Sequence, residues 1–241
     1  MAEGSDRDER LPAARRKAEV EAFLRDVAAL PSVTPAQGRG RLIFALDATA
    51  SREATWDHAC RLQGEMFEAA SALGGLDVKL VFYRGFNECK ASRWFGTAGD
   101  LHRAMRQVSC VGGDTQIARI LDHTLAEARA RKVNALVFVG DAMEENIDGL
   151  CRRAGELGLL GVPIFLFHEG GDPVAERSFR QLARLSGGTY CPFDAGSARQ
   201  LRELLGAVAA FAAGGRPALE AYGRRVGGEA LRLIGRIGSG S

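Results

Sequence analysis

The stretch that decides the fold reads LIFALDATAS and covers residues 42–51. Five apolar residues predict a buried strand, and Asp47, Thr49 and Ser51 follow it at alternate positions. In an open α/β sheet the functional crevice lies outside the carboxyl ends of the strands, so we expect these three side chains at that edge. They supply one carboxylate and two hydroxyls, which are hard oxygen ligands. The stretch therefore predicts a strand that ends in a candidate metal site.

Two later stretches supply matching oxygens. Thr115 follows the glycine pair Gly112-Gly113, where a tight loop can approach its neighbours closely, and Asp141 ends the apolar run that begins at Val137. Hydroxyls, carboxylates and water are the ligands of Mg²⁺, and Mn²⁺ accepts the same set. The predicted ligands of this Mg²⁺ or Mn²⁺ site are Asp47, Thr49, Ser51, Thr115 and Asp141. Ser51 and Thr115 are also good N-caps for the helices expected after them, which gives part of the pattern a structural explanation.

Strands and helices are expected to alternate through the middle of the chain. The strands are expected at 41–47, 77–83, 90–95, 133–140, 162–168 and 188–193, and the helices near 52–73, 98–108, 115–131, 146–159, 173–186 and 196–213. Several strands are apolar throughout, which is typical of a parallel sheet covered on both faces. The second and third strands lie too close for a crossover helix and should form an antiparallel hairpin. The expected fold class is α/β, an open and mostly parallel sheet with one antiparallel edge strand and helices on both faces.

The two ends of the chain differ from this middle part. Residues 1–40 are expected to hold a disordered start, a helix over 11–30 that ends at Pro31, and a linker. Residues 41–213 are expected to form one domain. Residues 214–241 form a basic extension with a partial apolar face. We expect it to form one or two helices that pack on the core or on a partner, or else a loosely docked tail.

Composition limits the function classes. The net charge is +2, so the overall charge does not attract the chain to nucleic acid or to anionic membranes. Aromatic residues are scarce among the arginines of the basic tail, which argues against RNA binding. The five cysteines are scattered without a CxxC pair, which favours reduced thiols. No signal peptide and no apolar run of membrane-spanning length is found. We therefore expect a soluble, cytoplasmic protein.

The combined pattern resembles the von Willebrand factor A (VWA) domain and its metal-ion-dependent adhesion site (MIDAS), over about residues 40–213. Asp47, Thr49 and Ser51 match the opening Asp-x-Ser-x-Ser, with Thr in place of the first Ser. Thr115 matches the threonine of the second loop and Asp141 the aspartate of the third. The resemblance implies that the hydroxyls contact the metal and that the aspartates act directly or through water. It also implies that an acidic residue of a protein partner takes the last coordination position.

Residues in three stretches depart from the family pattern or lie near it. The second loop reads Gly-Asp-Thr-Gln where the family often has Gly-Gly-Thr-Asp, so either Asp114 or Thr115 can be the ligand. Glu144 and Glu145 follow Asp141, and we expect them to start a helix rather than to add charge to the site. His168 ends an apolar strand and is expected to be a hydrogen-bonded residue and not a general base.

The predicted function is metal-dependent protein binding without catalysis. The resemblance implies an intracellular protein of bacterial type in a multiprotein assembly, and some such members act beside an AAA+ ATPase. In some relatives the last helix, here about 195–213, shifts with the metal site. One alternative is a Mg²⁺-dependent phosphoryl-transfer enzyme of the haloacid dehalogenase type with Asp47 as nucleophile, although Thr49 replaces its acid/base Asp. Another is a scaffold with a vestigial metal site that binds through its basic tail. Because Asp47 ends a strand, we expect Asp47→Ala to abolish metal dependence with limited loss of fold.

Overall fold

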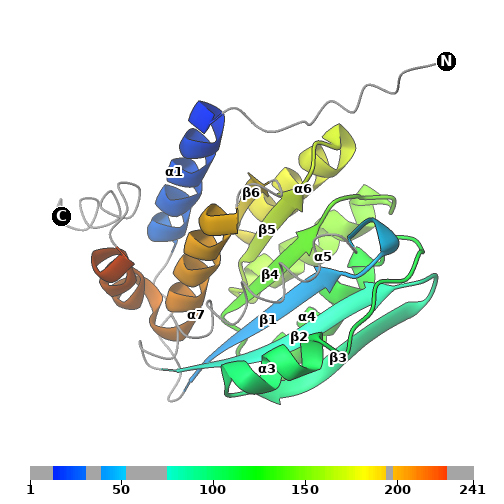
Figure 1. The fold of residues 1–241 in the computed structure, drawn as a ribbon, viewed down its shortest axis with the longest axis horizontal. Helices are drawn as coiled ribbons and strands as arrows, with labels where there is room; N and C mark the ends of the chain where they lie inside the picture. The colour runs from blue at the N-terminus through cyan, green and yellow to red at the C-terminus, as the bar shows by residue number, and fades with distance from the viewer. Residues whose placement is uncertain (1–12, 31–38, 53–74, 194–197, 227–241) are drawn as a thin grey trace.

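A six-stranded sheet forms the centre of this computed structural model, which describes residues 13–30, 39–52, 75–193 and 198–226. The strands are β1 (Gly40–Asp47), β2 (Leu76–Arg84), β3 (Glu88–Phe95), β4 (Ala135–Gly140), β5 (Ile164–Glu169) and β6 (Thr189–Phe193). Their order in the sheet is β3-β2-β1-β4-β5-β6, and every neighbouring pair is parallel except β2 and β3 (Figure 1). The α/β fold class and the antiparallel hairpin at one edge are confirmed.

Helices cover both faces of the sheet (Figure 1). They are α1 (Ala13–Ala29), α3 (Ala98–Met105), α4 (Ile117–Ala130), α5 (Ile147–Leu159), α6 (Pro173–Ser186) and α7 (Ala198–Val226), with a 3-10 turn η1 (Ala50–Arg52) after β1. The even positions of β1, such as Phe44, face the layer of α1, α3 and α7, and odd positions such as Ile43 face α4, α5 and α6. β1 is apolar on both faces because both are covered. The rest of the helix expected over 52–73 lies outside the described residues.

The predicted strand starts at 133 and 162 are two residues early. β4 begins at Ala135 and β5 at Ile164. Proline has no N–H to donate to a strand ladder, so Pro163 does not extend β5, and its carbonyl instead accepts from the N–H of Leu136 at 3.0 Å.

The N-terminal helix α1 packs on the sheet. Phe23 contacts the rings of Phe165 and Phe167 at centroid distances of 6.0 and 5.3 Å, and Val27 is fully buried. Asp26 accepts a hydrogen bond from the hydroxyl of Thr189 at 3.0 Å, which ties the helix to the start of β6. The helix predicted over 11–30 is therefore confirmed from Ala13 to Ala29, and its apolar face belongs to the same core as the sheet.

The first part of the basic extension is helical and packed. Helix α7 bends at Gly214-Gly215, where Gly215 has a φ of +64° that favours glycine. The following turns run back along the first half of α7, with Leu219 and Tyr222 buried. A Cβ on Gly206 would lie 2.1 Å from the Tyr222 hydroxyl oxygen, so glycine is required at this crossing. The extension is helical to Val226, and through Tyr222 it packs on the core, which is one of the arrangements expected for it.

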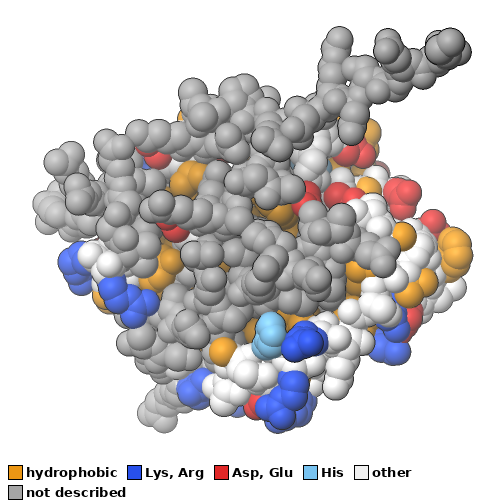
Figure 2. All heavy atoms as spheres, in the orientation of Figure 1, with side chains coloured by type: hydrophobic (Ala, Val, Ile, Leu, Met, Phe, Trp, Pro, Cys, Tyr) orange, Lys and Arg blue, Asp and Glu red, His pale blue; other side chains and the backbone are white. Residues whose placement is uncertain are grey.

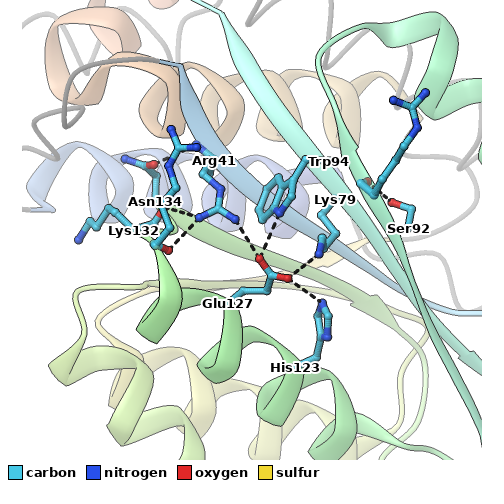
Figure 3. Close-up of polar contacts among 10 residues, drawn as sticks. Arg41, Lys79, Ser92, Trp94, His123, Glu127, Lys132 and Asn134 are labelled. Atoms are coloured by element: carbon cyan, nitrogen blue, oxygen red, sulfur yellow. Dashed lines mark hydrogen bonds and ion pairs between the residues drawn. The ribbon is translucent and has the colours of Figure 1, made fainter.

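Under the C-terminal end of α4, a polar network joins the helix to three strands (Figure 3). The carboxylate of Glu127 accepts hydrogen bonds from Arg41 at 2.9 Å and from the indole N–H of Trp94 at 3.1 Å, and it pairs with Lys79. The guanidinium carbon of Arg41 lies 3.9 Å from the centroid of the Trp94 ring. The side chains of Arg41 and Lys79 are nearly buried, so one carboxylate balances two cations away from bulk water. Burial favours a higher pKa for Glu127, but hydrogen bonds from Lys79 and Trp94 outweigh it and the pKa is lowered.

Glu127→Gln is expected to lower the free energy of unfolding by about 3 kcal/mol, because it leaves two nearly buried cations without a counter-charge. Urea denaturation at pH 7 measures this loss. Glu156→Gln, which removes an exposed ion pair with Arg129, is the control and should cost less than about 1 kcal/mol. Equal losses in the two variants would contradict the role of the network.

The same variant has a defined pH dependence. The folded-state pKa of Glu127 is lowered, so its ionised carboxylate stabilises the folded state fully above the unfolded-state pKa of about 4.3. This contribution to the free energy of unfolding is lost as pH falls through the folded-state pKa. The difference in stability between the wild type and Glu127→Gln should therefore shrink as the pH is lowered below about 4.

Candidate metal centre

The carboxyl ends of β1 and β4 bring Asp47 and Asp141 to the same edge of the sheet. The two strands are parallel neighbours, with Leu46 opposite Val139. Gly140 therefore comes opposite Asp47, and a Cβ on Gly140 would lie 3.7 Å from the Asp47 Cβ. It would also lie 2.8 Å from the Phe138 ring, so this crowded strand end requires glycine. Asp141 follows directly in the chain.

Asp47 is fully buried and both of its oxygens accept hydrogen bonds. Oδ1 accepts from the backbone N–H of Thr49 and Oδ2 from the hydroxyl of Tyr83, each at 2.8 Å. Tyr83 is opposite Asp47 in the β1–β2 register and is itself buried. Asp47→Ala would leave the Tyr83 hydroxyl without this acceptor, at a cost of about 1–3 kcal/mol. The limited loss of fold expected for Asp47→Ala took Asp47 to be a strand-end residue outside the core. Asp47 is buried, so we expect the alanine variant to lose stability as well as a ligand.

Tyr83 is a site residue that sequence reasoning missed. The signal was its position, because Tyr83 ends the strand beside β1 and lies on the same face as the last residue of β1. That position becomes visible only when the register of the two strands is known.

The carboxylate of Asp47 is held in an unfavourable environment for a charge. Burial raises the pKa of Asp47, and the nearby charge of Asp141 adds to the rise, while the hydrogen bonds from Thr49 and Tyr83 oppose it. Burial likewise raises the pKa of Tyr83 well above its ordinary value, and the Asp47 charge adds to it, so Tyr83 stays a hydrogen-bond donor. A dication at this edge would favour the ionised form of Asp47.

Asp141 carries an unpartnered buried oxygen. Its Oδ1 is buried and makes no hydrogen bond to any part of the chain that the structure describes. Its backbone carbonyl accepts from His168 Nε2 at 3.3 Å, and His168 Nδ1 contacts the Tyr190 hydroxyl at 2.9 Å. Since the carbonyl can only accept, Nε2 carries the proton, and Nδ1 of the neutral ring accepts from Tyr190. Burial lowers the pKa of His168, which agrees with this neutral form and confirms the expected hydrogen-bonded role.

The three hydroxyls differ in exposure. Thr49 is buried, and its Oγ1 lies 3.0 Å from the Oγ of the exposed Ser51, so the first motif points two hydroxyls toward one another. Thr115 is buried whereas Asp114 is exposed. Of the two possible registers of the second loop, the structure therefore favours Thr115 as the inward-facing residue.

Thr115 does not act as a helix cap. Its Oγ1 accepts the backbone N–H of Glu144, and its own N–H donates to the Glu144 carboxylate, both at 3.1 Å. Helix α4 has Gln116 at its N-cap position, without a side-chain cap. The predicted N-cap role of Thr115 is wrong because its hydroxyl is directed to the loop after β4. The cap role predicted for Ser51 concerns a helix outside the described residues.

Glu145 caps α4 from across the site. Its carboxylate accepts from the backbone N–H groups of Ile117 and Ala118, the latter at 3.0 Å. Burial raises the pKa of Glu145, and these hydrogen bonds oppose the rise. Both glutamates were expected to start their own helix, but α5 begins at Ile147 with Asn146 as its N-cap. They instead bind the second loop and α4, so the loops that carry Thr115 and Asp141 are joined by four hydrogen bonds.

This arrangement matches known structures at the level of fold. No family model and no curated protein matches this chain. Among solved structures, the VWA domain of SpRpn10 matches with a TM-score of 0.57 and 13% identity over 69% of this chain and 94% of that one. The fold is VWA-like.

Other structures support the same VWA-like fold. A point mutant of the PilB minor pilin from Streptococcus sanguinis matches with a TM-score of 0.56 and 9% identity, over 80% of this chain and 65% of that one. The proximal thread matrix protein 1 of the mussel byssus matches with a TM-score of 0.56 and 17% identity, over 76% of this chain and 48% of that one. This chain thus spans nearly all of the SpRpn10 domain but only about half to two-thirds of these two proteins.

The site differs from a metal centre rich in charged ligands. Within the described ranges, no group of three or more His, Cys, Asp and Glu side chains is placed to hold a metal. The predicted ligand set contains two carboxylates and three hydroxyls, so its charge would be lower than in such a cluster. The observation that favours a cation here is the buried and unpartnered oxygen of Asp141 beside the buried Asp47.

In the absence of metal, Asp47→Asn is expected to raise the melting temperature at pH 7. The amide keeps the shape and one acceptor but removes a charge that burial and Asp141 disfavour. Because the folded-state pKa of Asp47 is raised, the contribution of Asp47 to stability is greatest below its unfolded-state pKa of about 3.9 and declines as pH rises through the folded-state pKa. Thermal unfolding in EDTA between pH 4 and pH 7.5 should therefore show that the melting temperature of Asp47→Asn exceeds that of the wild type by an amount that grows with pH.

The control for this prediction is Asp114→Asn, which removes an exposed carboxylate from the neighbouring loop. It should leave the melting temperature within about 1 °C of the wild type at every pH. An Asp47→Asn variant that is less stable than the wild type across the whole range would contradict the prediction.

Proposed function

We propose that this chain is a divalent-metal-dependent protein-binding module. Mg²⁺ or Mn²⁺ would be held at the carboxyl edge of the sheet by Asp47, Thr49, Ser51, Thr115 and Asp141. The main support for this proposal is a pair of aspartates at that edge. Asp47 is fully buried, and Asp141 has a buried oxygen that makes no hydrogen bond within the described residues. A dication satisfies that oxygen and offsets the repulsion between the two carboxylates.

The proposed partner contact follows from the charge of the ligand set. Two carboxylates neutralise a dication formally, but the hydrogen bonds that Asp47 accepts from Tyr83 and Thr49 withdraw part of its charge from the metal. The metal when bound would supply an electrophilic coordination position for an oxygen of the partner. A carboxylate from an Asp or Glu is the strongest candidate among protein groups.

The fold supports a binding role and an assembly context. Proteins with VWA-like folds among the solved structures include the human COPII-coat protein Sec24c and the pilus adhesin SpaC, whose names describe a coat and an adhesin. We extend that kind of role to this chain as part of the proposal. In line with the resemblance to intracellular bacterial members, we place it in a cytoplasmic assembly, with an AAA+ ATPase as one candidate partner. No helix within the described ranges is long and apolar enough to span a membrane.

The residue at position 49 and the contacts of the glutamates argue against phosphoryl transfer. The enzyme alternative needs an acid/base Asp two residues after the nucleophile, and here that residue is Thr49, whose hydroxyl lies 3.0 Å from that of Ser51. In the enzyme alternative either Glu144 or Glu145 would join Asp141 as a later acidic motif, but both glutamates bind backbone N–H groups of the second loop and α4. We therefore propose that the chain is not an enzyme.

Metal binding is tested by thermal unfolding in EDTA and in millimolar Mg²⁺ or Mn²⁺. A metal present at about 100 times its dissociation constant should stabilise the wild type by about 2.7 kcal/mol, which is about 5–10 °C for a chain of this size. Asp47→Asn, Asp141→Asn and Thr115→Val should each lose most of this rise.

Asp114→Asn is the matched control for the second loop and should keep the full rise, since that carboxylate is exposed. No rise in the wild type, or an equal rise in Asp47→Asn, would reject this metal site. A rise lost in Asp114→Asn but kept in Thr115→Val would assign the loop ligand to Asp114.

The absence of catalysis has its own test. With Mg²⁺ and para-nitrophenyl phosphate, the wild type should release no more product than Asp47→Asn, because Thr49 cannot act as the acid/base that the reaction needs. Hydrolysis by the wild type that disappears in Asp47→Asn would instead establish the phosphoryl-transfer alternative.

A further inference from the structure

Two large apolar side chains stand exposed beside the candidate metal centre. Phe86, in the β2–β3 turn, is 72% exposed, and Val111, in the loop before α4, is 44% exposed. The two segments are adjacent, because the N–H of Gly85 donates to the Val111 carbonyl at 3.2 Å. Figure 2 shows hydrophobic atoms at the right-hand end of the molecule, where the β2–β3 hairpin turns in Figure 1.

The hairpin turn that carries Phe86 is held rigidly. The Gln116 amide donates to the carbonyls of Arg84 and Gly85 at 3.2 and 3.0 Å. A Cβ on Gly113 would lie 2.0 Å from the Gly85 carbonyl oxygen, so the two backbones are in direct contact. The residues that precede Phe86 are therefore anchored to the start of α4 and the loop before it, which lowers the cost of ordering the turn when a partner binds.

This apolar surface is continuous with the proposed metal ligands. The N–H of Val111 donates to the Ala48 carbonyl at 3.1 Å, within the first motif. A Cβ on Gly112 would lie 4.0 Å from the Cβ of Ala50, which is exposed. We call Ala50, Gly112, Val111 and Phe86 the apolar rim. It runs from the segment between Thr49 and Ser51 to the tip of the hairpin.

Basic side chains stand beside the apolar rim. The guanidinium of Arg119 donates to the backbone and side-chain oxygens of Asn87, next to Phe86, at 2.7 and 3.0 Å. Those acceptors are neutral, so Arg119 keeps its full charge at this corner. Arg84 and Lys90 share Glu88, which leaves a net positive charge there too, and the exposed carboxylate of Asp114 in the loop of Val111 offsets only part of the positive charge. An acidic segment is the complementary partner for this surface.

We propose that the apolar rim is a second recognition element, which binds an aromatic or aliphatic side chain that lies beside the metal-coordinating Asp or Glu of an acidic partner segment. This inference rests on the proposed function and narrows it. The acid would fix the segment at the metal, and the apolar residue would set which acidic segments bind. Metal coordination alone selects poorly, since any exposed carboxylate can offer an oxygen.

The test is selection of a phage-displayed library of random linear peptides on the full chain in Mg²⁺, with elution first by EDTA and then by acid, so that metal-dependent and metal-independent binders are both recovered. The expected peptides carry an Asp or Glu and, at a constant spacing from it, an aromatic or aliphatic residue. Phe86→Ser should weaken a selected peptide at least about tenfold, because burial of a phenyl ring is lost. Leu159→Ser is the matched control. Leu159 is 91% exposed and lies at the C-terminal end of α5, whereas the N-terminal end of this helix follows the loop of Asp141, so the substitution should leave binding unchanged.

The outcomes separate this inference from the proposed function. Selected peptides that carry an acid but no preferred apolar residue would reject the role of the apolar rim. So would peptides that bind Phe86→Ser and the wild type with equal affinity. Both outcomes are compatible with the proposed metal site. Apolar peptides that bind equally in EDTA and to Asp47→Asn overturn the proposed metal-dependent function, and with it this inference. Concentration-dependent dimers of the wild type that Phe86→Ser abolishes overturn it too, since the rim would then bind a second copy.

Discussion

The buried carboxylate of Asp47 is the constraint around which the carboxyl edge of the sheet is arranged. A buried charge is tolerated only when its oxygens are satisfied, and here the Thr49 N–H and the Tyr83 hydroxyl satisfy both. These contacts tie the end of β1 to the loop that follows it and to β2. The second carboxylate belongs to Asp141, which directly follows the neighbouring strand β4. Gly140, the last residue of β4, lies close to Asp47 because it has no side chain. The edge thus holds two acids in a space where a divalent cation would be favourable.

Helix α4 links this edge to the opposite end of the sheet. At its N-terminus the carboxylate of Glu145 accepts from two of the first backbone N–H groups, where a negative charge complements the helix dipole. At its C-terminal end Glu127 holds Arg41 and Lys79, which lie on β1 and β2 (Figure 3). The face of the sheet under α4 is therefore polar at both ends and apolar between them. This pattern specifies the position of the helix along the strands, because a shift in either direction would leave a buried charge unpaired.

The other face of the sheet is completed by the two ends of the described chain. Phe23 of α1 fills the space over β5, and Tyr222 of the extension packs against Gly206 of α7. Both segments lie outside the central run of alternating strands and helices in the sequence, yet both bury apolar side chains in the same core. Helix α7 contacts α1, and its last turns pack back against its first half at Gly206 (Figure 1).

The sequence alone determined the α/β class, the strands to within two residues and the antiparallel hairpin, because apolar runs and short connections depend on local order along the chain. It also indicated which carboxylates and hydroxyls end the strands. It did not reveal that Tyr83 binds Asp47, that Thr115 faces inward while Asp114 is exposed, or that Glu145 caps α4. Those contacts join residues 27 to 36 positions apart, so they depend on strand register and on loops meeting in space. Only the tertiary structure decides them, because burial and pairing of a charge are properties of its three-dimensional neighbours and not of its place in the chain.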